Sequence, residues 1–120
     1  MKLDEGLLEF LSGPVLLMAS AADSRRRPAI ARGMGARGTD EGAVEVAFSS
    51  WQWPDVVSNV GASGRLALTA CRANDYVTYQ LKGAAALREA RAEDLAHARR
   101  YWEALTEVLL QNHVPPHIMN

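Results

Sequence analysis

Polar side chains that could bind a charged ligand occur at two places where the surrounding pattern predicts regular structure. Arg32 lies in a mostly apolar run between Ile30 and Met34, and a guanidinium in such surroundings needs a carboxylate partner or an anionic ligand. Ser49 and Ser50 follow a predicted strand and precede the start of a predicted helix. Hydroxyl groups beside a helix N-terminus are suited to binding an anion. Both places therefore predict contact with a negatively charged group.

The arginines near Arg32 admit two interpretations. Residues 24–39 contain five arginines and no acidic residue, whereas the whole chain has a net charge of −1. The near-neutral total argues against a nucleic-acid or membrane partner, and the run at residues 25–27 is typical of a solvated turn. Arg32 itself is either paired internally, with Glu45 as the candidate acid, or bound to a ligand. Its position in the sequence leaves both interpretations open.

Several kinds of catalytic or metal site are not indicated. The chain has no glycine-rich dinucleotide fingerprint and no P-loop, and no serine, histidine and aspartate are spaced as a triad. The lone Cys71 lies in an apolar run and is expected to be a small buried side chain in a reducing cytoplasm. His113 and His117 flank two prolines and lack the helical spacing of a metal site, so we expect no metal and an extended tail over residues 112–120.

The length and composition of the chain predict a single domain over residues 1–120. This length is enough to bury one core without metals or disulfides. No long apolar run is present, so neither a secretory signal nor a membrane span is expected. These features predict a cytoplasmic protein with no membrane or nucleic-acid partner.

Hydrophobic periodicity predicts a helix, three strands, a short helix, two strands and a final helix. The first helix is capped by Asp4 and ends before Gly13, and Pro54 suits the first turn of the short helix. The predicted strands cover residues 15–19, 28–34, 44–48, 65–71 and 76–83, and the final helix starts at residue 93. This order predicts a mainly β chain that forms an antiparallel β-barrel, with short helices plugging it and a C-terminal helix.

One face of the predicted strand at residues 28–34 carries only small side chains, namely Ala29, Ala31 and Gly33. Either a backbone segment or a flat ligand approaches this face closely, or the glycines at positions 33, 35 and 38 mark bulges where a barrel strand bends. Of the two interpretations, we favour the bend.

Four motifs occur in an order that indicates a family. They are the proline that opens the second strand, the FSS corner before the short helix, the RLALTA strand and the run DYVTYQLKG at residues 75–83. Together, over about residues 7–110, the chain resembles the FMN-binding split-barrel proteins related to pyridoxamine 5′-phosphate oxidase. This resemblance implies a split β-barrel of the Greek-key type and a homodimer with FMN in a groove between the subunits. It also implies a redox function, as a small oxidoreductase or an electron carrier.

The resemblance further implies which residues face the cofactor: Arg32, Met34, Ser49, Ser50, Trp51, Gln80 and Lys82. The first turn of the short helix has no cation and carries Asp55, so Arg32, Arg37 or Lys82 would have to hold the flavin phosphate. Heme or a deazaflavin is the alternative cofactor within the fold, and a nonredox small barrel that binds a polyanion is the alternative outside the family. A surface ion pair remains the alternative role for Lys82, and a hydrogen bond to a neighbouring strand remains the alternative for Gln80.

Overall fold

The computed structural model describes residues 4–111, which form three helices and six strands. In chain order these are α1 (Glu5–Ser12), β1 (Leu16–Ala22), β2 (Pro28–Arg32), β3 (Ala36–Gly38), β4 (Val44–Val46), α2 (Pro54–Ser63), β5 (Arg65–Cys71), β6 (Thr78–Ala84) and α3 (Ala92–Gln111). The three predicted helices and the strand at residues 65–71 are confirmed, whereas β3 was not predicted as a separate strand. None of the helices in this described part of the chain is long and apolar enough to cross a membrane.

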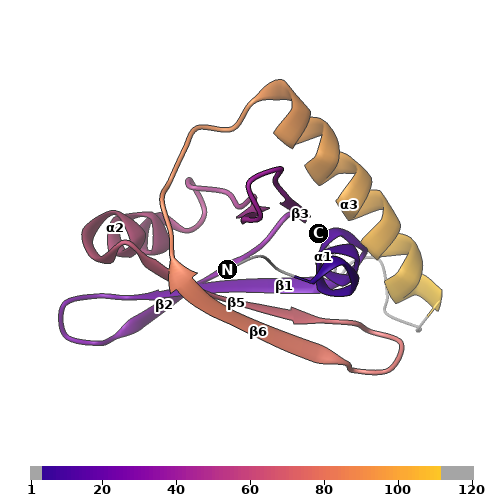
Figure 1. Cartoon of the computed structure of the whole chain (residues 1–120), viewed down its shortest axis with the longest axis horizontal. Helices are drawn as coiled ribbons and strands as arrows, with labels where there is room; N and C mark the ends of the chain where they lie inside the picture. Colours follow the sequence, from indigo (N-terminus) through magenta and orange to yellow (C-terminus); the bar gives the residue numbers. More distant parts are fainter. Residues whose placement is uncertain (1–3, 112–120) are drawn as a thin grey trace.

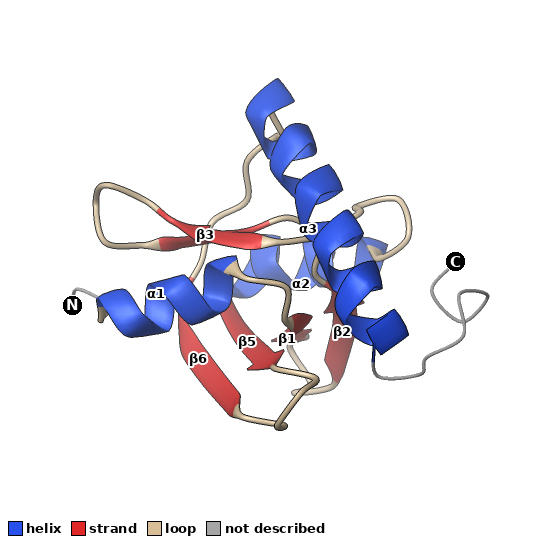
Figure 2. Ribbon diagram, turned by 90° about the vertical axis from the view of Figure 1, so that its right-hand side faces the viewer, coloured by secondary structure: helices blue, strands red, loops and turns tan. Residues whose placement is uncertain are grey.

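A four-stranded antiparallel sheet in the order β2-β1-β5-β6 forms the base of the molecule, and β3 and β4 form a separate two-stranded sheet. Figure 1 and Figure 2 show the three helices and the β3–β4 hairpin on one side of the four-stranded sheet. Apart from the end of β2, where Trp102 of α3 contacts the guanidinium of Arg32, no helix or strand of residues 4–111 covers the opposite side, which we call the open face. The strand register places these side chains on the open face: Leu16, Met18, Ser20, Ile30, Arg32, Arg65, Ala67, Thr69, Cys71, Thr78, Gln80 and Lys82.

The covered face of the sheet is apolar. Alternation along β1 sends Leu17, Ala19 and Ala21 to this face, where Leu17 joins a core with side chains of α1 and α3. The two alanines and Ala31 of β2 form a second core with α2, and Asn59 of α2 donates a hydrogen bond to the Ala21 carbonyl at 2.9 Å. The small-residue face of β2 therefore packs against a helix, which explains its alanines without a flat ligand.

Glycines redirect the chain after β2, where the strand was predicted to continue to residue 34. The Gly33 amide still donates a hydrogen bond to Leu17 of the first sheet at 2.9 Å, but the Met34 amide donates to Ala47, next to β4, at 2.6 Å. A Cβ at position 33 would lie 2.7 Å from the Cβ of Leu17, and Gly35 has a φ of +114° that side chains disfavour. The chain thus crosses from one sheet to the other here, as the bend interpretation of these glycines predicted.

Two expectations about the fold class need correction. The chain is mixed α/β rather than mainly β, since α3 alone spans 20 residues. The described strands also form two sheets and no closed barrel. The physical reason is that Tyr101, Leu105 and Leu109 of α3 complete a core shared with β1, β3 and β5, so the strands do not have to close around it. The antiparallel pairing and the C-terminal helix are as predicted.

Candidate functional site

Arg32 is half-buried at the end of β2, with its guanidinium carbon 5.2 Å from the ring centre of Trp102 in α3. This distance is typical of a cation–π contact. Arg32 forms no ion pair with any carboxylate of residues 4–111. Glu45, the predicted internal partner, instead pairs with Arg88 at 2.7 Å and with Arg37 at 3.9 Å. The structure therefore contradicts an internal pair between Arg32 and Glu45, one of the two alternatives left open by the sequence, and the donors of Arg32 lack an acidic acceptor within the described chain.

The strand register aligns Arg32 with three further residues in a row across the open face. Met18 of β1 lies opposite Arg32 on one side and opposite Thr69 of β5 on the other. Thr69 in turn lies opposite Gln80 of β6, whose amide group donates a hydrogen bond to the Thr69 hydroxyl at 3.3 Å. Lys82 lies in the next row of the same face. Neighbouring strands are about 4.8 Å apart, so the row spans roughly 15 Å from β2 to β6.

The open face carries cations and no acidic residue. Arg32, Arg65 and Lys82 belong to it, and Lys82 forms no ion pair within residues 4–111. Between these cations lie apolar side chains, of which Met18 and Ile30 each expose 50% of their surface. An uncovered surface that carries apolar side chains between cations suits an anion with an apolar ring.

The other predicted cofactor residues lie outside the open face. Ser49, Ser50 and Trp51 belong to the loop between β4 and α2, where the Ser49 hydroxyl accepts a hydrogen bond from the Gln52 amide at 3.2 Å. The Trp51 side chain is 88% exposed. Met34 lies in the crossing between the two sheets. Of the seven predicted residues, only those on β2 and β6 share the open face.

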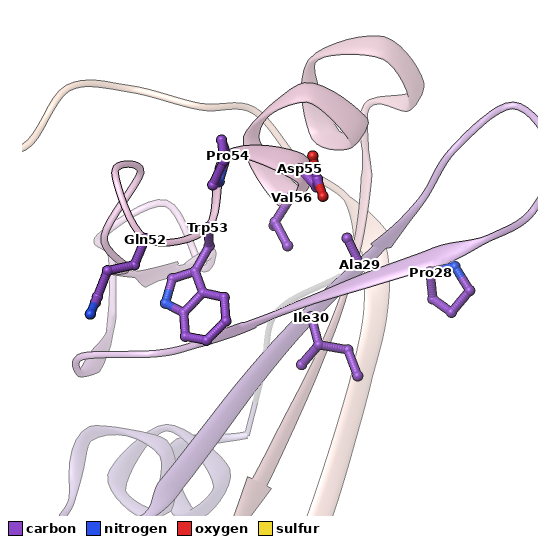
Figure 3. A pocket seen from close by; sticks show the side chains of 8 residues that line it. All are labelled: Pro28, Ala29, Ile30, Gln52, Trp53, Pro54, Asp55 and Val56. Carbon is purple, nitrogen blue, oxygen red and sulfur yellow. The ribbon is translucent and has the colours of Figure 1, made fainter.

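A small pocket lies between this loop and β2 (Figure 3). Its volume is about 280 Å³, and its lining consists of Pro28, Ala29, Ile30, Gln52, Trp53, Pro54, Asp55 and Val56. The first turn of α2 contains the Asp55 carboxylate, which already complements the positive end of the helix dipole. Ligand pockets usually have volumes of about 300 to 1,000 Å³, so this pocket is too small for a whole cofactor.

Arg37, a predicted candidate for binding phosphate, belongs to an ion-pair network that fastens α3 to the second sheet. Its guanidinium pairs with Asp94 at the start of α3 and with Glu45 of β4. Arg88 bridges the same two carboxylates, at 2.7 Å from each. Hydrogen bonds from the Arg88 guanidinium and the Arg91 amide hold the pKa of Asp94 well below its usual range. Arg37 therefore helps to attach α3 to the second sheet, and its positive charge is already balanced by carboxylates.

Sequence reasoning missed Arg65, Thr69 and Trp102 as neighbours of the predicted residues. Alternation along β5 does place Arg65 and Thr69 on one side of the strand, but no local signal shows that this side is uncovered. Trp102 reaches Arg32 only through the packing of α3. Cys71, which was predicted to be buried, is half-buried at the margin of the open face.

Comparisons of the chain with protein-family models, with curated proteins and with solved structures find no match. The described residues contain no group of three or more His, Cys, Asp or Glu side chains that could hold a metal ion. His113, His117 and the predicted tail at residues 112–120 lie outside the described residues. The geometry of the open face is therefore the basis for assigning a function.

Proposed function

We propose that this protein binds FMN on the open face and takes part in a redox reaction, as a small oxidoreductase or an electron carrier. The observation that supports this function best is the half-buried Arg32, which has no carboxylate partner within residues 4–111 and belongs to an acid-free surface. Partial burial of a guanidinium without an acidic acceptor costs free energy, and an anionic ligand would remove that cost. The row of Met18, Thr69 and Gln80 offers the same ligand both apolar and hydrogen-bonding surface.

When bound, a flavin supplies the electron transfer itself, because its ring carries hydride or single electrons. The residues of this chain need only bind the ring, orient it and place charge beside it. Arg32 and Lys82 are the groups for the phosphate or the anionic edge of the reduced ring. Gln80 is the hydrogen-bonding group for its polar edge, and Met18 and Ile30 provide apolar contact.

A second copy of the chain would complete the site. Ligand sites bury most of their ligand, whereas the open face is largely uncovered, so in this proposal one chain supplies one wall of the groove and a homodimer supplies both. The split-barrel topology of the Greek-key type belongs to the same proposal. Its support is the backbone connection between the sheets, where the Met34 amide donates to Ala47 at 2.6 Å and the Ala47 amide donates to Gly35 at 3.0 Å.

A deazaflavin or heme is the second candidate ligand. The observation in its favour is the shortage of cations for a phosphate group, because Asp55 stands at the start of α2 and Arg37 is paired with Asp94 and Glu45. Arg32, Arg65 and Lys82 are then the cations of the open face that remain for any anionic group.

The deciding experiment is the visible absorption spectrum of the purified protein, followed by identification by mass of whatever denaturation releases. Flavin bands and released FMN are expected, or, if the protein is purified empty, saturable binding of added FMN. A Soret band would identify heme, and a released deazaflavin would identify the other alternative. A colourless protein that does not bind FMN but binds RNA with a steep dependence on salt concentration would contradict the flavin proposal and support polyanion binding.

A further inference from the structure

A groove separate from the open face lies between α1 and the turn that joins β5 to β6. Its volume is about 640 Å³, and its walls include Leu7, Phe10, Pro14, Val77, Tyr79 and Val108. Its lining residues come from α1, from α3 and from the turn, and it is partly open to solvent.

The aromatic wall of the groove is held in place by a chain of contacts. The Phe10 and Tyr79 rings pack edge to face, with centroids 4.9 Å apart and planes at 77°. The guanidinium carbon of Arg72 lies 5.2 Å from the Phe10 ring centre, and Arg72 donates two hydrogen bonds to Asp75, at 3.0 and 2.7 Å. Asp75 therefore balances the charge of Arg72. The rings are prearranged, so a ligand would lose little free energy in ordering them.

Tyr76, in the turn beside this wall, has an unusual conformation. Its φ is +60°, which is uncommon for a residue with a large side chain, and its side chain is 79% exposed. The conformation is held because the Tyr76 amide donates to the Arg72 carbonyl at 2.8 Å and the Thr78 hydroxyl donates to the Tyr76 carbonyl at 2.9 Å. Strained backbone of this kind is concentrated at ligand clamps and active sites. The Tyr76 ring is thus exposed in the turn that supplies Val77 to the groove, although Tyr76 itself is not among the lining residues.

The edge of the groove is acidic. Asp4 and Glu9 line it, and neither forms an ion pair within residues 4–111. Glu5 adds a third carboxylate near Asp4 and Glu9, and the residues of α1 include no lysine or arginine. Since Asp75 balances Arg72, the described residues around the groove carry a net negative charge. A partner that is apolar along its length and positive at one end would complement it.

We infer that this groove binds an extended, basic, proline-containing segment of another protein. An open groove buries little of its ligand, so the ligand must lose little entropy on binding. Segments in the polyproline II conformation meet this condition because they are already extended before they bind, and they dock against exposed aromatic rings. The flanking lysine or arginine of such a segment would pair with Asp4 and Glu9.

The inference can be tested by fluorescence anisotropy with the full chain and a short labelled peptide that contains prolines flanked by arginines. Saturable binding is expected, and a matched peptide with glutamates in place of the arginines should bind at least about tenfold more weakly. Glu9→Lys should weaken the arginine peptide about tenfold, because Glu9 is exposed and its replacement reverses the charge of the groove edge.

Two further variants distinguish binding in the groove from a general effect of charge or of unfolding. Tyr76→Gly removes the ring while suiting the positive φ, so it should weaken binding several-fold and leave the circular dichroism spectrum unchanged. Glu41→Lys, in the exposed turn between β3 and β4, makes the same charge change as Glu9→Lys away from the groove and should not alter affinity. No saturable binding at millimolar peptide, equal affinity for both peptides, or unchanged affinity in Glu9→Lys and Tyr76→Gly would each overturn the inference.

Discussion

At the scale of single residues, Arg32 has an environment unlike those of the other partly buried arginines. Arg37 and Arg88 are also partly covered, but both are paired with Asp94 and Glu45. Arg32 contacts an aromatic face and forms no ion pair within residues 4–111. A planar guanidinium that stacks on one side still has donors in its plane, so it can hold an anionic group.

Arg32→Ala is expected to lower FMN affinity by about tenfold to a hundredfold, the usual effect of losing a charge-assisted hydrogen bond. Lys82→Ala should have a smaller effect in the same direction, since Lys82 is exposed. Titration of added FMN followed by flavin fluorescence measures both. Arg99→Ala, on the exposed side of α3, is the control for a general loss of positive charge. Unchanged affinity in both Arg32→Ala and Lys82→Ala would remove these residues from the site.

Trp102 is expected to position the Arg32 guanidinium. Trp102→Leu should weaken FMN binding by up to about tenfold, because a cation–π contact contributes about 0.5–2 kcal/mol. Trp102→Phe keeps an aromatic face and should retain most of the affinity. The same fluorescence titration compares the two variants, with urea unfolding as a check on stability. Equal losses in the leucine and phenylalanine variants would show that the aromatic face of Trp102 does not matter.

At the scale of elements, the crossing between the two sheets depends on the lack of a side chain at Gly33. In Gly33→Ala the new Cβ would lie 2.7 Å from the Leu17 Cβ and 3.1 Å from a Val46 methyl, and such overpacking costs about 1–3 kcal/mol of stability. Gly61→Ala is the matched control, because nothing lies within 4 Å of its Cβ and an alanine in α2 should add about 0.5–1 kcal/mol. Urea unfolding measures both free energies. A neutral or stabilising Gly33→Ala would contradict the close approach.

The start of α3 depends on the Asp94 carboxylate, whose pKa in the folded state lies below its ordinary value of 3.8. A lowered pKa means that this stabilisation is present above pH 3.8 and is lost as the pH falls through the folded-state pKa. Asp94→Asn should therefore lower the melting temperature at pH 7 by roughly 5 °C and have a smaller effect near pH 2. Thermal unfolding followed by circular dichroism at a series of pH values measures this.

Asp40→Asn is the control for this prediction, because Asp40 is exposed in the β3–β4 turn and forms no ion pair within residues 4–111. Its melting temperature should follow that of the unmodified protein across the pH range. If Asp94→Asn matched the unmodified protein at pH 7, the network of Arg37, Arg88 and Asp94 would not stabilise the attachment of α3.

At the scale of the whole molecule, the four-stranded sheet is covered by helices on one side, and its other side, the open face, is largely exposed. A homodimer would cover Met18 and Ile30, and light scattering at micromolar protein concentration is expected to give the mass of a dimer. Met18→Arg adds a cation to the middle of the open face and should shift the mass to that of a monomer without loss of helix signal. Leu95→Arg, at a side chain that is 65% exposed on α3, should leave the dimer intact. A monomer in the unmodified protein would contradict the intersubunit groove.

The sequence by itself determined the local elements of this protein. Pro54 and the glycines near residue 64 define α2, a continuous apolar run defines β5, and the apolar stripe from residue 95 onward defines α3, because turn chemistry and hydrophobic patterns are properties of short segments. The glycines after β2 likewise predicted the bend, since their backbone freedom is local. Alternation alone also assigned Gln80 and Lys82 to the same side of their strand, as the register of β6 confirms.

Only the tertiary structure decided which of these positions meet. The row from Arg32 to Gln80 depends on β1 and β5 pairing in one register, and the contact of Arg32 with Trp102 depends on where α3 packs. The pairing of Glu45 with Arg88 rather than Arg32 and the absence of a closed barrel within residues 4–111 are also long-range outcomes. These long-range contacts depend on the free energy of burying whole faces of sheets and helices against one another, and the sequence of a short segment does not determine that free energy.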